Sequence, residues 1–153
     1  FASVDDILKK FHQKPEGVSY LAIHQEAIDR CFDSSRMEDI IRNLEQEQTE
    51  WATQTAQTLR KMCPASLKVV LKQLRKAKTM AMHEIMKMEL RIGVRMVERY
   101  DISEGVRAVL IDKDNKPQWD PPTLEAVTNE IVDACFAPFK DEKDELQFVP
   151  PNC

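Results

Sequence analysis

A basic stripe runs along one predicted helical face near the middle of the chain. Its members are spaced at i, i+4, i+7 and i+8, which puts them on the same side of a helix: Lys68, Lys72, Arg75 and Lys76. Lys61 and Lys78 flank the stripe. Cations gathered in this way can bind phosphate groups or the acidic surface of a partner. A solvated helix face is the alternative interpretation, and the spacing leaves both open.

Histidine and cysteine form no pattern that is typical of catalysis or metal binding. His83 is followed by Glu84, but Lys87 stands where an H-E-x-x-H zinc motif needs its second histidine. His24 and Cys31 share a helical face, yet two turns separate them by about 10 Å, whereas proton transfer needs about 3 Å. The sequence therefore predicts no catalytic residue and no metal site in this chain. We expect reduced thiols, with a disulfide left open, at Cys31, Cys63, Cys135 and Cys153.

Glycine is scarce, with three among 153 residues: Gly17, Gly93 and Gly105. Phosphate-binding loops and oxyanion loops need clustered glycines, so neither is expected in this chain. The formal net charge of −4 argues against a general nucleic-acid binder. No apolar run approaches the ~20 residues that span a bilayer.

Helical periodicity recurs along the chain, and no pair of strands is recognisable. The pattern predicts an all-α fold, an irregular domain of about six to eight helices over residues 1–139. A charged, Pro-rich tail over 140–153 is expected to be extended. Ser3 is expected to cap the first helix. Ser35 and Glu38 have the spacing of a capping box at the start of another.

The longest helix is expected over residues 79–100, with Gly93 packed closely against a neighbouring helix. Thr123 is expected to cap the last clear helix, which runs to about Cys135. Because the first residue is Phe1 rather than Met, we expect a processed or truncated piece.

Several segments of the second half follow one another in a recognisable order. They are CPASLK at 63–68, VVLKQL at 69–74, MELR at 88–91, EGVRAVLIDKD at 104–114 and KPQW at 116–119. This order resembles the C-terminal part of the 3-hydroxyisobutyryl-CoA hydrolases, a branch of the crotonase (enoyl-CoA hydratase/isomerase) superfamily. CFDSSRMEDIIRNL at 31–44 resembles the segment that precedes S-P-x-S-L-K in that family. The resemblance covers all but the tail after Phe139.

The resemblance implies a larger enzyme, more than twice this length. In that family an N-terminal ββα core carries the Gly-rich oxyanion loops and the catalytic carboxylates. This chain would be the helical C-terminal part without that core, inactive alone, which packs against the core and closes over the acyl-CoA site. The implied reaction is thioester hydrolysis of 3-hydroxyisobutyryl-CoA in mitochondrial valine breakdown. The CoA thioester is the substrate, and no cofactor is implied.

The resemblance also implies where CoA binds. Lys113 corresponds to a lysine that contacts the CoA phosphates in related enzymes, although Val109 stands where those enzymes carry an aromatic residue. Lys68 and Lys72 of the basic stripe are the second candidate contact. The expected partners are the acyl-CoA, the core and, through the apolar face that the core normally covers, a second copy of the chain. No membrane partner is expected, and no nucleic acid unless the chain is a paralogue that serves in a ribosome.

Two other interpretations remain open. The first is a non-catalytic paralogue that serves as a structural subunit, for example of a mitochondrial ribosome. The second is a helical interaction module unrelated to CoA. An upstream sequence with an intact oxyanion loop and a Glu/Asp pair would favour the enzyme.

Overall fold

The computed structural model describes residues 3–13 and 16–148, which contain nine α-helices, one π-helical turn and one 3₁₀ turn, with no β-strand. In chain order the elements are α1 (Val4–Phe11), α2 (Tyr20–Ile23), α3 (Gln25–Phe32), α4 (Met37–Glu47), α5 (Glu50–Lys61), α6 (Pro64–Ala77), α7 (Met82–Val97), α8 (Tyr100–Val106), η1 (Arg107–Ile111), α9 (Asn129–Ala134) and η2 (Glu142–Asp144).

Local sequence signals explain several helix ends. Ser3 and Asp6 form a reciprocal capping box that opens α1. Gln48 adopts a left-handed conformation after α4, and Thr49 then caps α5 by accepting a hydrogen bond from the Ala52 amide. Pro64 occupies the first turn of α6, where its missing N–H costs nothing. The first break folds α5 back along α4, and after the second break α6 packs against α4.

Two buried hydrophobic clusters hold the helices together. The first lies among α3, α4 and α5 and is made of Cys31, Met37, Ile40, Ile41, Leu44, Ala52 and Ala56. The second is made of Cys63, Ala65, Val69, Met88, Ile92, Val127, Val132 and Cys135. Helix α6 belongs to both, because Leu67 and Leu71 pack on the first cluster while Ala65 and Val69 lie in the second.

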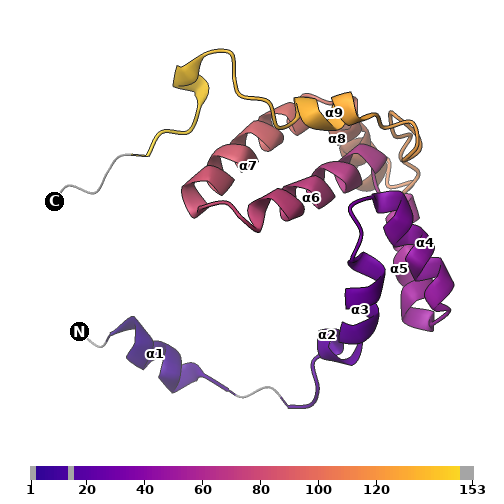
Figure 1. The fold of residues 1–153 in the computed structure, drawn as a ribbon, viewed down its shortest axis with the longest axis vertical. Coiled ribbons are helices and arrows are strands. Elements are labelled where there is room, and N and C mark those ends of the chain that lie inside the picture. The colour runs from indigo at the N-terminus through magenta and orange to yellow at the C-terminus, as the bar shows by residue number, and fades with distance from the viewer. Residues whose placement is uncertain (1–2, 14–15, 149–153) are drawn as a thin grey trace.

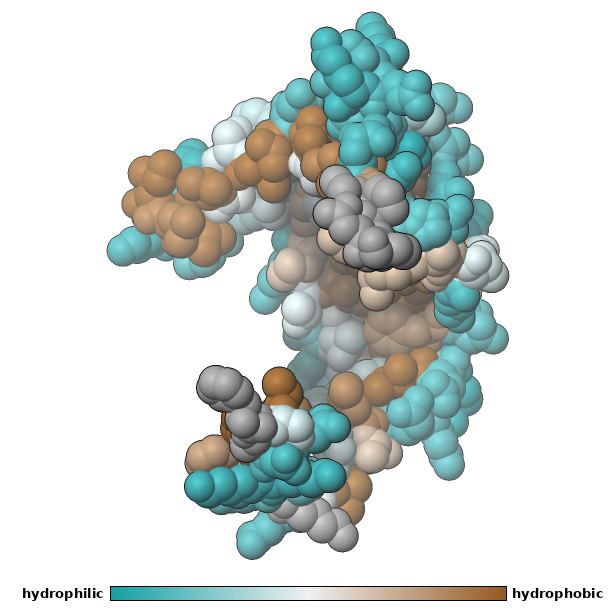
Figure 2. Space-filling view, turned by 90° about the vertical axis from the view of Figure 1, so that its left-hand side faces the viewer, coloured by the Kyte–Doolittle hydropathy of each residue, from teal (hydrophilic) through white to brown (hydrophobic). Residues whose placement is uncertain are grey.

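The helices follow an open curve rather than closing around one centre (Figure 1). The α6–α7 hairpin lies at one end of the curve, the α4–α5 hairpin follows, and α1 lies at the other end. Figure 2 looks into the opening and shows hydrophobic side chains on its walls. The apolar stripe of α1, made of Val4, Ile7, Leu8 and Phe11, is exposed throughout, Phe11 by 73%, and so are Leu110 and Ile111 of η1, by 66% and 69%.

The predicted count of six to eight helices is below the nine α-helices of the described residues, because the stretch from Tyr20 to Phe32 divides at His24 into α2 and α3. Two other predicted helices are shorter than expected. The segment 79–100 divides where Arg99 adopts an extended backbone and α8 starts at Tyr100. The last helix begins at Asn129 rather than after Thr123, because Thr128 accepts a hydrogen bond from the Ile131 amide and caps it. Gly93 does not pack against a neighbour, since a Cβ added there would meet nothing within 4 Å.

The predicted tail is described as far as residue 148. Within it Glu142–Asp144 forms the 3₁₀ turn η2. Both carboxylate oxygens of Glu145 lie 2.9 Å from Nε of Arg91 and share its N–H in a bifurcated hydrogen bond, which fastens this part of the tail to α7. Cys153 lies outside the described residues, whereas the other three cysteines are free and buried.

Candidate functional site

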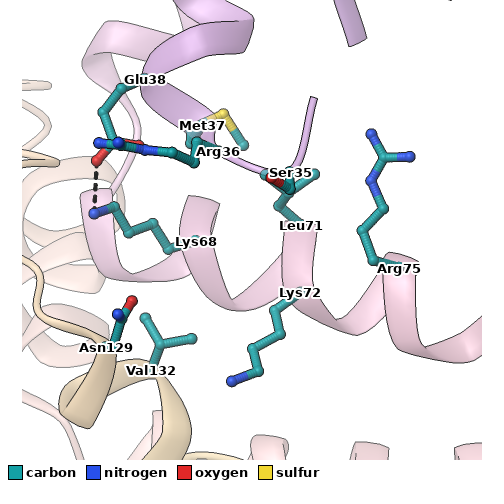
Figure 3. Close-up of a pocket in the computed structure, with 10 residues that line it drawn as sticks. All are labelled: Ser35, Arg36, Met37, Glu38, Lys68, Leu71, Lys72, Arg75, Asn129 and Val132. Carbon is teal, nitrogen blue, oxygen red and sulfur yellow. Dashed lines mark ion pairs between the residues drawn. The ribbon is translucent and has the colours of Figure 1, made fainter. Parts of the chain in front are cut away.

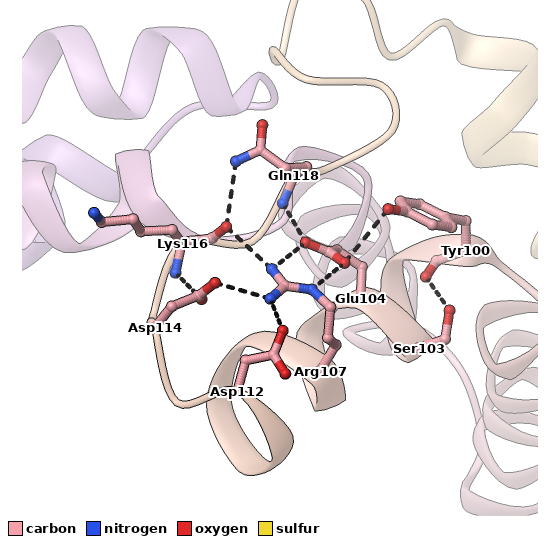
Figure 4. Close-up of polar contacts among 8 residues, drawn as sticks. All are labelled: Tyr100, Ser103, Glu104, Arg107, Asp112, Asp114, Lys116 and Gln118. Carbon is pink, nitrogen blue, oxygen red and sulfur yellow. Dashed lines mark hydrogen bonds and ion pairs between the residues drawn. The ribbon is translucent and has the colours of Figure 1, made fainter.

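Arg107 is the centre of a dense polar network at the start of η1 (Figure 4). Its guanidinium forms a bidentate pair with Glu104, with both N···O distances 2.8 Å. Its Nη1 also donates to Asp112 at 2.6 Å and to Asp114 at 2.8 Å. Three carboxylates on one guanidinium raise the pKa of Arg107 well above its ordinary value, with Glu104 the largest cause. Arg107 is therefore a fixed cation that ties α8 to the following loop.

Glu104 is buried although it is charged, with 5% of its surface exposed. Hydrogen bonding to Arg107, and then to the Gln118 amide at 2.7 Å, lowers its pKa to about 2. Tyr100 donates a further hydrogen bond of 3.4 Å from its hydroxyl. Glu104 is thus held as a carboxylate, so it has no proton to give as a general acid near neutral pH.

Asp101 repeats this arrangement one helical turn earlier. It is 4% exposed, accepts two hydrogen bonds of 3.0 and 3.1 Å from Arg99, and accepts a third of 2.8 Å from the Asp120 amide. The two buried carboxylates of α8 therefore hold the segment 118–120 along that helix. Sequence reasoning missed both carboxylates, although the D-x-x-E spacing between two arginines was the available signal.

The backbone between Arg107 and Lys116 is unusual. The Asp112 amide donates to the Arg107 carbonyl at 2.8 Å, a five-residue step that makes η1 a π-helical turn. Lys113 and Asn115 then have φ values of 56° and 53°, in the left-handed region that side-chain-bearing residues seldom adopt. The Asn115 amide donates to the Ala108 carbonyl at 3.0 Å, which folds the loop back onto η1. Lys113 is exposed on this loop.

An apolar pocket of about 350 Å³ lies beside this network. The Trp119 ring covers Gly105 so closely that a Cβ added to this glycine would lie 3.4 Å from the ring. The indole N–H donates to the Lys61 carbonyl at 3.1 Å. Val109 and Leu110 form part of the pocket wall and are exposed. Val109, where the family resemblance implies an aromatic residue, thus presents an aliphatic side chain.

Three members of the basic stripe, Lys68, Lys72 and Arg75, line a different pocket, of about 610 Å³, between α4, α6 and α9 (Figure 3). Lys68 pairs with Glu38 at 2.7 Å and donates to the Val127 carbonyl at 3.0 Å. Lys72 pairs with Asp133, and Arg75 donates to two carbonyls at the end of α3, both at 2.7 Å. These three cations therefore have internal partners that join the helices. Lys113 is not among the residues that line this pocket.

The predicted capping box at Ser35 and Glu38 is not formed. Helix α4 begins at Met37 with Arg36 as its N-cap residue, and no side chain caps it. Burial raises the pKa of Glu38, but the hydrogen bond from Lys68, a backbone hydrogen bond and the positive charges of Lys68 and Arg36 together outweigh it, so the pKa is lowered overall. Glu38 therefore pairs with Lys68, thirty residues later in the sequence, and does not cap α4.

The histidines and cysteines take structural positions. His24 stacks on Trp51, with ring centroids 5.1 Å apart. Burial raises the pKa of the Cys31 and Cys135 thiols, which disfavours their reactive thiolates. No cluster of three or more His, Cys, Asp or Glu side chains suited to a metal occurs in residues 3–13 and 16–148. Nor does any helix in the described part of the chain have the length and apolarity to cross a membrane.

Comparison with known proteins places this arrangement in a family. Residues 1–136 match the enoyl-CoA hydratase/isomerase family. The mitochondrial 3-hydroxyisobutyryl-CoA hydrolase of Gallus gallus is 39% identical over 140 residues, which are 89% of this chain and 36% of that protein. The corresponding protein of Danio rerio is 39% identical over 141 residues, or 92% of this chain and 37% of that protein. The chain thus spans little more than a third of the curated relatives it matches.

Two solved structures share the same arrangement. A carnitinyl-CoA dehydratase from Mycobacterium thermoresistibile matches with a TM-score of 0.80 and 32% identity, over 90% of this chain and 39% of that one. An enoyl-CoA hydratase from Rhodobacter sphaeroides 2.4.1 matches with a TM-score of 0.79 and 30% identity, over 94% of this chain and 44% of that one.

These matches correct the predicted fold class. An all-α fold of six to eight helices is wrong as a class, because the structural neighbours are crotonase-fold enzymes of which this chain matches only a part. The physical reason is that helical periodicity reports local elements and carries no information about a sheet in another part of a fold. With two solved structures and the family match over residues 1–136 in agreement, the chain belongs to the enoyl-CoA hydratase/isomerase family.

Proposed function

We propose that this chain is the C-terminal helical part of a mitochondrial acyl-CoA thioester hydrolase of the 3-hydroxyisobutyryl-CoA type, which acts in valine breakdown. The observation that carries the proposal is the 39% identity to the Gallus gallus hydrolase over 89% of this chain. The catalytic groups lie, in this proposal, in the portion of the enzyme that corresponds to the unmatched part of the relatives. This chain alone is then inactive.

The exposed apolar faces support packing against such a core. On α7, Met82, Met86, Gly93 and Val97 fall within about 60° of one another around the helix. Met82 and Val97 are 73% and 67% exposed, and the space over Gly93 is open. A helix that presents an apolar face with a glycine in it is suited to close contact with another element. The exposed stripe of α1 and the exposed side chains of η1 offer further contact area.

Lys113 is the proposed contact to the CoA phosphates. It stands in the resemblance where related enzymes place such a lysine, and its side chain is exposed on the loop after η1. Lys68 and Lys72 are the weaker candidates, because both already have carboxylate partners.

The test is hydrolysis of 3-hydroxyisobutyryl-CoA by the full-length protein, measured as release of the free CoA thiol. Crotonyl-CoA serves as the comparison substrate, because a hydratase would add water to it without releasing CoA. Thiol release from the first substrate supports the proposal. Hydration of crotonyl-CoA without thiol release, or turnover by residues 1–153 alone, would overturn it.

A further inference from the structure

Arg107 forms ion pairs with both of the carboxylates that flank Lys113 in the sequence. Asp112 and Asp114 flank Lys113 in the sequence and are the nearest acids along the chain. Both are bound instead to Nη1 of Arg107, at 2.6 and 2.8 Å. Across residues 3–13 and 16–148, no ion pair includes the Lys113 ammonium. Lys113 therefore keeps an uncompensated charge between two acidic neighbours.

The backbone of the loop is held by the same arginine. Two left-handed residues without glycine, Lys113 and Asn115, sit within three positions of the chain. Such a conformation persists where surrounding contacts over-determine it, and it is concentrated at ligand sites. Here the contacts are the Arg107 pairs to Asp112 and Asp114, a 3.4 Å hydrogen bond from Arg107 to the Lys116 carbonyl, and the Asn115–Ala108 backbone bond.

We propose that Arg107 is a positioning residue that keeps the Lys113 ammonium available for a phosphate group of CoA. It does so by occupying Asp112 and Asp114 and by holding the loop in one conformation. This rests on the proposed function, in which Lys113 contacts CoA.

Only an arginine suits this role. The guanidinium has five N–H donors in a planar fork, and in Arg107 they reach three carboxylates and one carbonyl. A lysine has three donors on one nitrogen and cannot span the same acceptors. Without the guanidinium, Asp112 and Asp114 become free to pair with Lys113 itself.

The experiment compares the binding of CoA and of pantetheine by the full-length protein, measured by calorimetry. Pantetheine lacks the nucleotide phosphates, so it reports on the remainder of the site. The variants are Lys113→Ala, Arg107→Gln, Arg107→Lys and the double variant Arg107→Gln/Lys113→Ala. Arg60→Gln is the matched control, because Arg60 pairs with Glu45 at 2.6 Å on the exposed surface.

We expect Lys113→Ala and Arg107→Gln each to weaken CoA binding about tenfold, the loss of one charge-assisted hydrogen bond. Pantetheine binding should not change, and Arg60→Gln should bind both ligands like the wild type. The double variant should bind CoA no more weakly than Lys113→Ala alone, because both changes remove one contact. Adding Asp112→Asn and Asp114→Asn to Arg107→Gln should restore part of the affinity by removing the competing acids.

Two results separate the possible failures. Unchanged CoA affinity in Lys113→Ala overturns the proposed CoA contact, and the positioning role with it. Two results would overturn the positioning role alone, provided that Lys113→Ala weakens CoA binding as expected. The first is a double variant whose loss of CoA affinity equals the sum of the two single losses. The second is an equal loss of CoA and pantetheine affinity in Arg107→Gln. Circular dichroism shows whether Arg107→Gln folds. If it does not, the CoA and pantetheine affinities of Arg107→Lys test the positioning role in its place.

Discussion

Nζ of Lys68 on α6 lies 2.7 Å from Oε1 of Glu38 at the start of α4. The same ammonium donates to the Val127 carbonyl in the second hydrophobic cluster. One side chain thus joins helix α4, which carries much of the first cluster, to a residue of the second cluster. Both partners of the ion pair are mostly shielded, with 19% and 17% of their side chains exposed.

Replacing Lys68 by methionine should lower the free energy of unfolding by about 1–3 kcal/mol, because Glu38 and the Val127 carbonyl lose their partner. Urea denaturation of this chain measures it, and a cycle with Glu38→Gln gives the coupling. Arg60→Gln is the control: its pair with Glu45 is 58% and 46% exposed, so about 0–1 kcal/mol is expected. Equal losses in the two variants would contradict a structural role for Lys68.

Leu44→Ala should cost about 2–5 kcal/mol, because Leu44 is fully buried in the first cluster and the cavity left behind cannot collapse completely. Leu74→Ala, at a position 62% exposed on α6, should change stability little. Both are measured from the urea midpoint. A small effect at Leu44 would mean that the first cluster is not a packed core.

Gly93→Ala should stabilise this chain alone by up to about 1 kcal/mol, since alanine is the better helix former and nothing stands within 4 Å of the new Cβ. In the full-length protein the gain should vanish or reverse if another element covers this face of α7. The two melting temperatures, each against its own wild type, decide. A gain in both would show that the face stays open.

Lowering the pH should remove the contribution of Glu104 to the free energy of unfolding. Its folded pKa is about 2, below its ordinary value of 4.5, so it binds a proton less readily in the folded state. Its contribution is therefore fully present above pH 4.5 and is lost as the pH falls toward 2. Glu104→Gln should flatten the decline of stability over that interval. Glu26→Gln, at a side chain 95% exposed, should leave the decline unchanged.

Local signals predicted the helices but not their connections. The Ser3 cap is confirmed, because it depends on residues three positions apart. The predicted capping box at Ser35 is wrong, because Glu38 pairs instead with the half-buried Lys68, thirty residues later. A contact between distant residues outweighs the local preference for a helix cap. It forms only in the folded chain, so no local sequence pattern predicts it.

The candidate site shows the same division. The EGVRAVLIDKD segment could be recognised in the sequence, yet its apolar V-L-I run has the composition of a strand and is a π-helical turn. The roles of Asp101 and Glu104 depend on amides of residues 118 and 120, which only the folded chain brings to α8. Whether Lys113, Lys68 or Lys72 contacts CoA stays a prediction.

Because η1 is a π-helical turn, the direction of the loop that follows depends on the number of residues in η1. An α-helix turns by about 100° per residue, and each of its backbone hydrogen bonds spans four residues. In η1 the hydrogen bond between Asp112 and Arg107 spans five residues. A chain with one residue deleted from η1 could close an ordinary α-helical turn and would keep the helix. It would, however, carry Asp112, Lys113 and Asp114 around the axis relative to Arg107. Insertion or deletion of one amino acid here is therefore a larger change than most substitutions, because it alters which charged groups this corner of the protein presents.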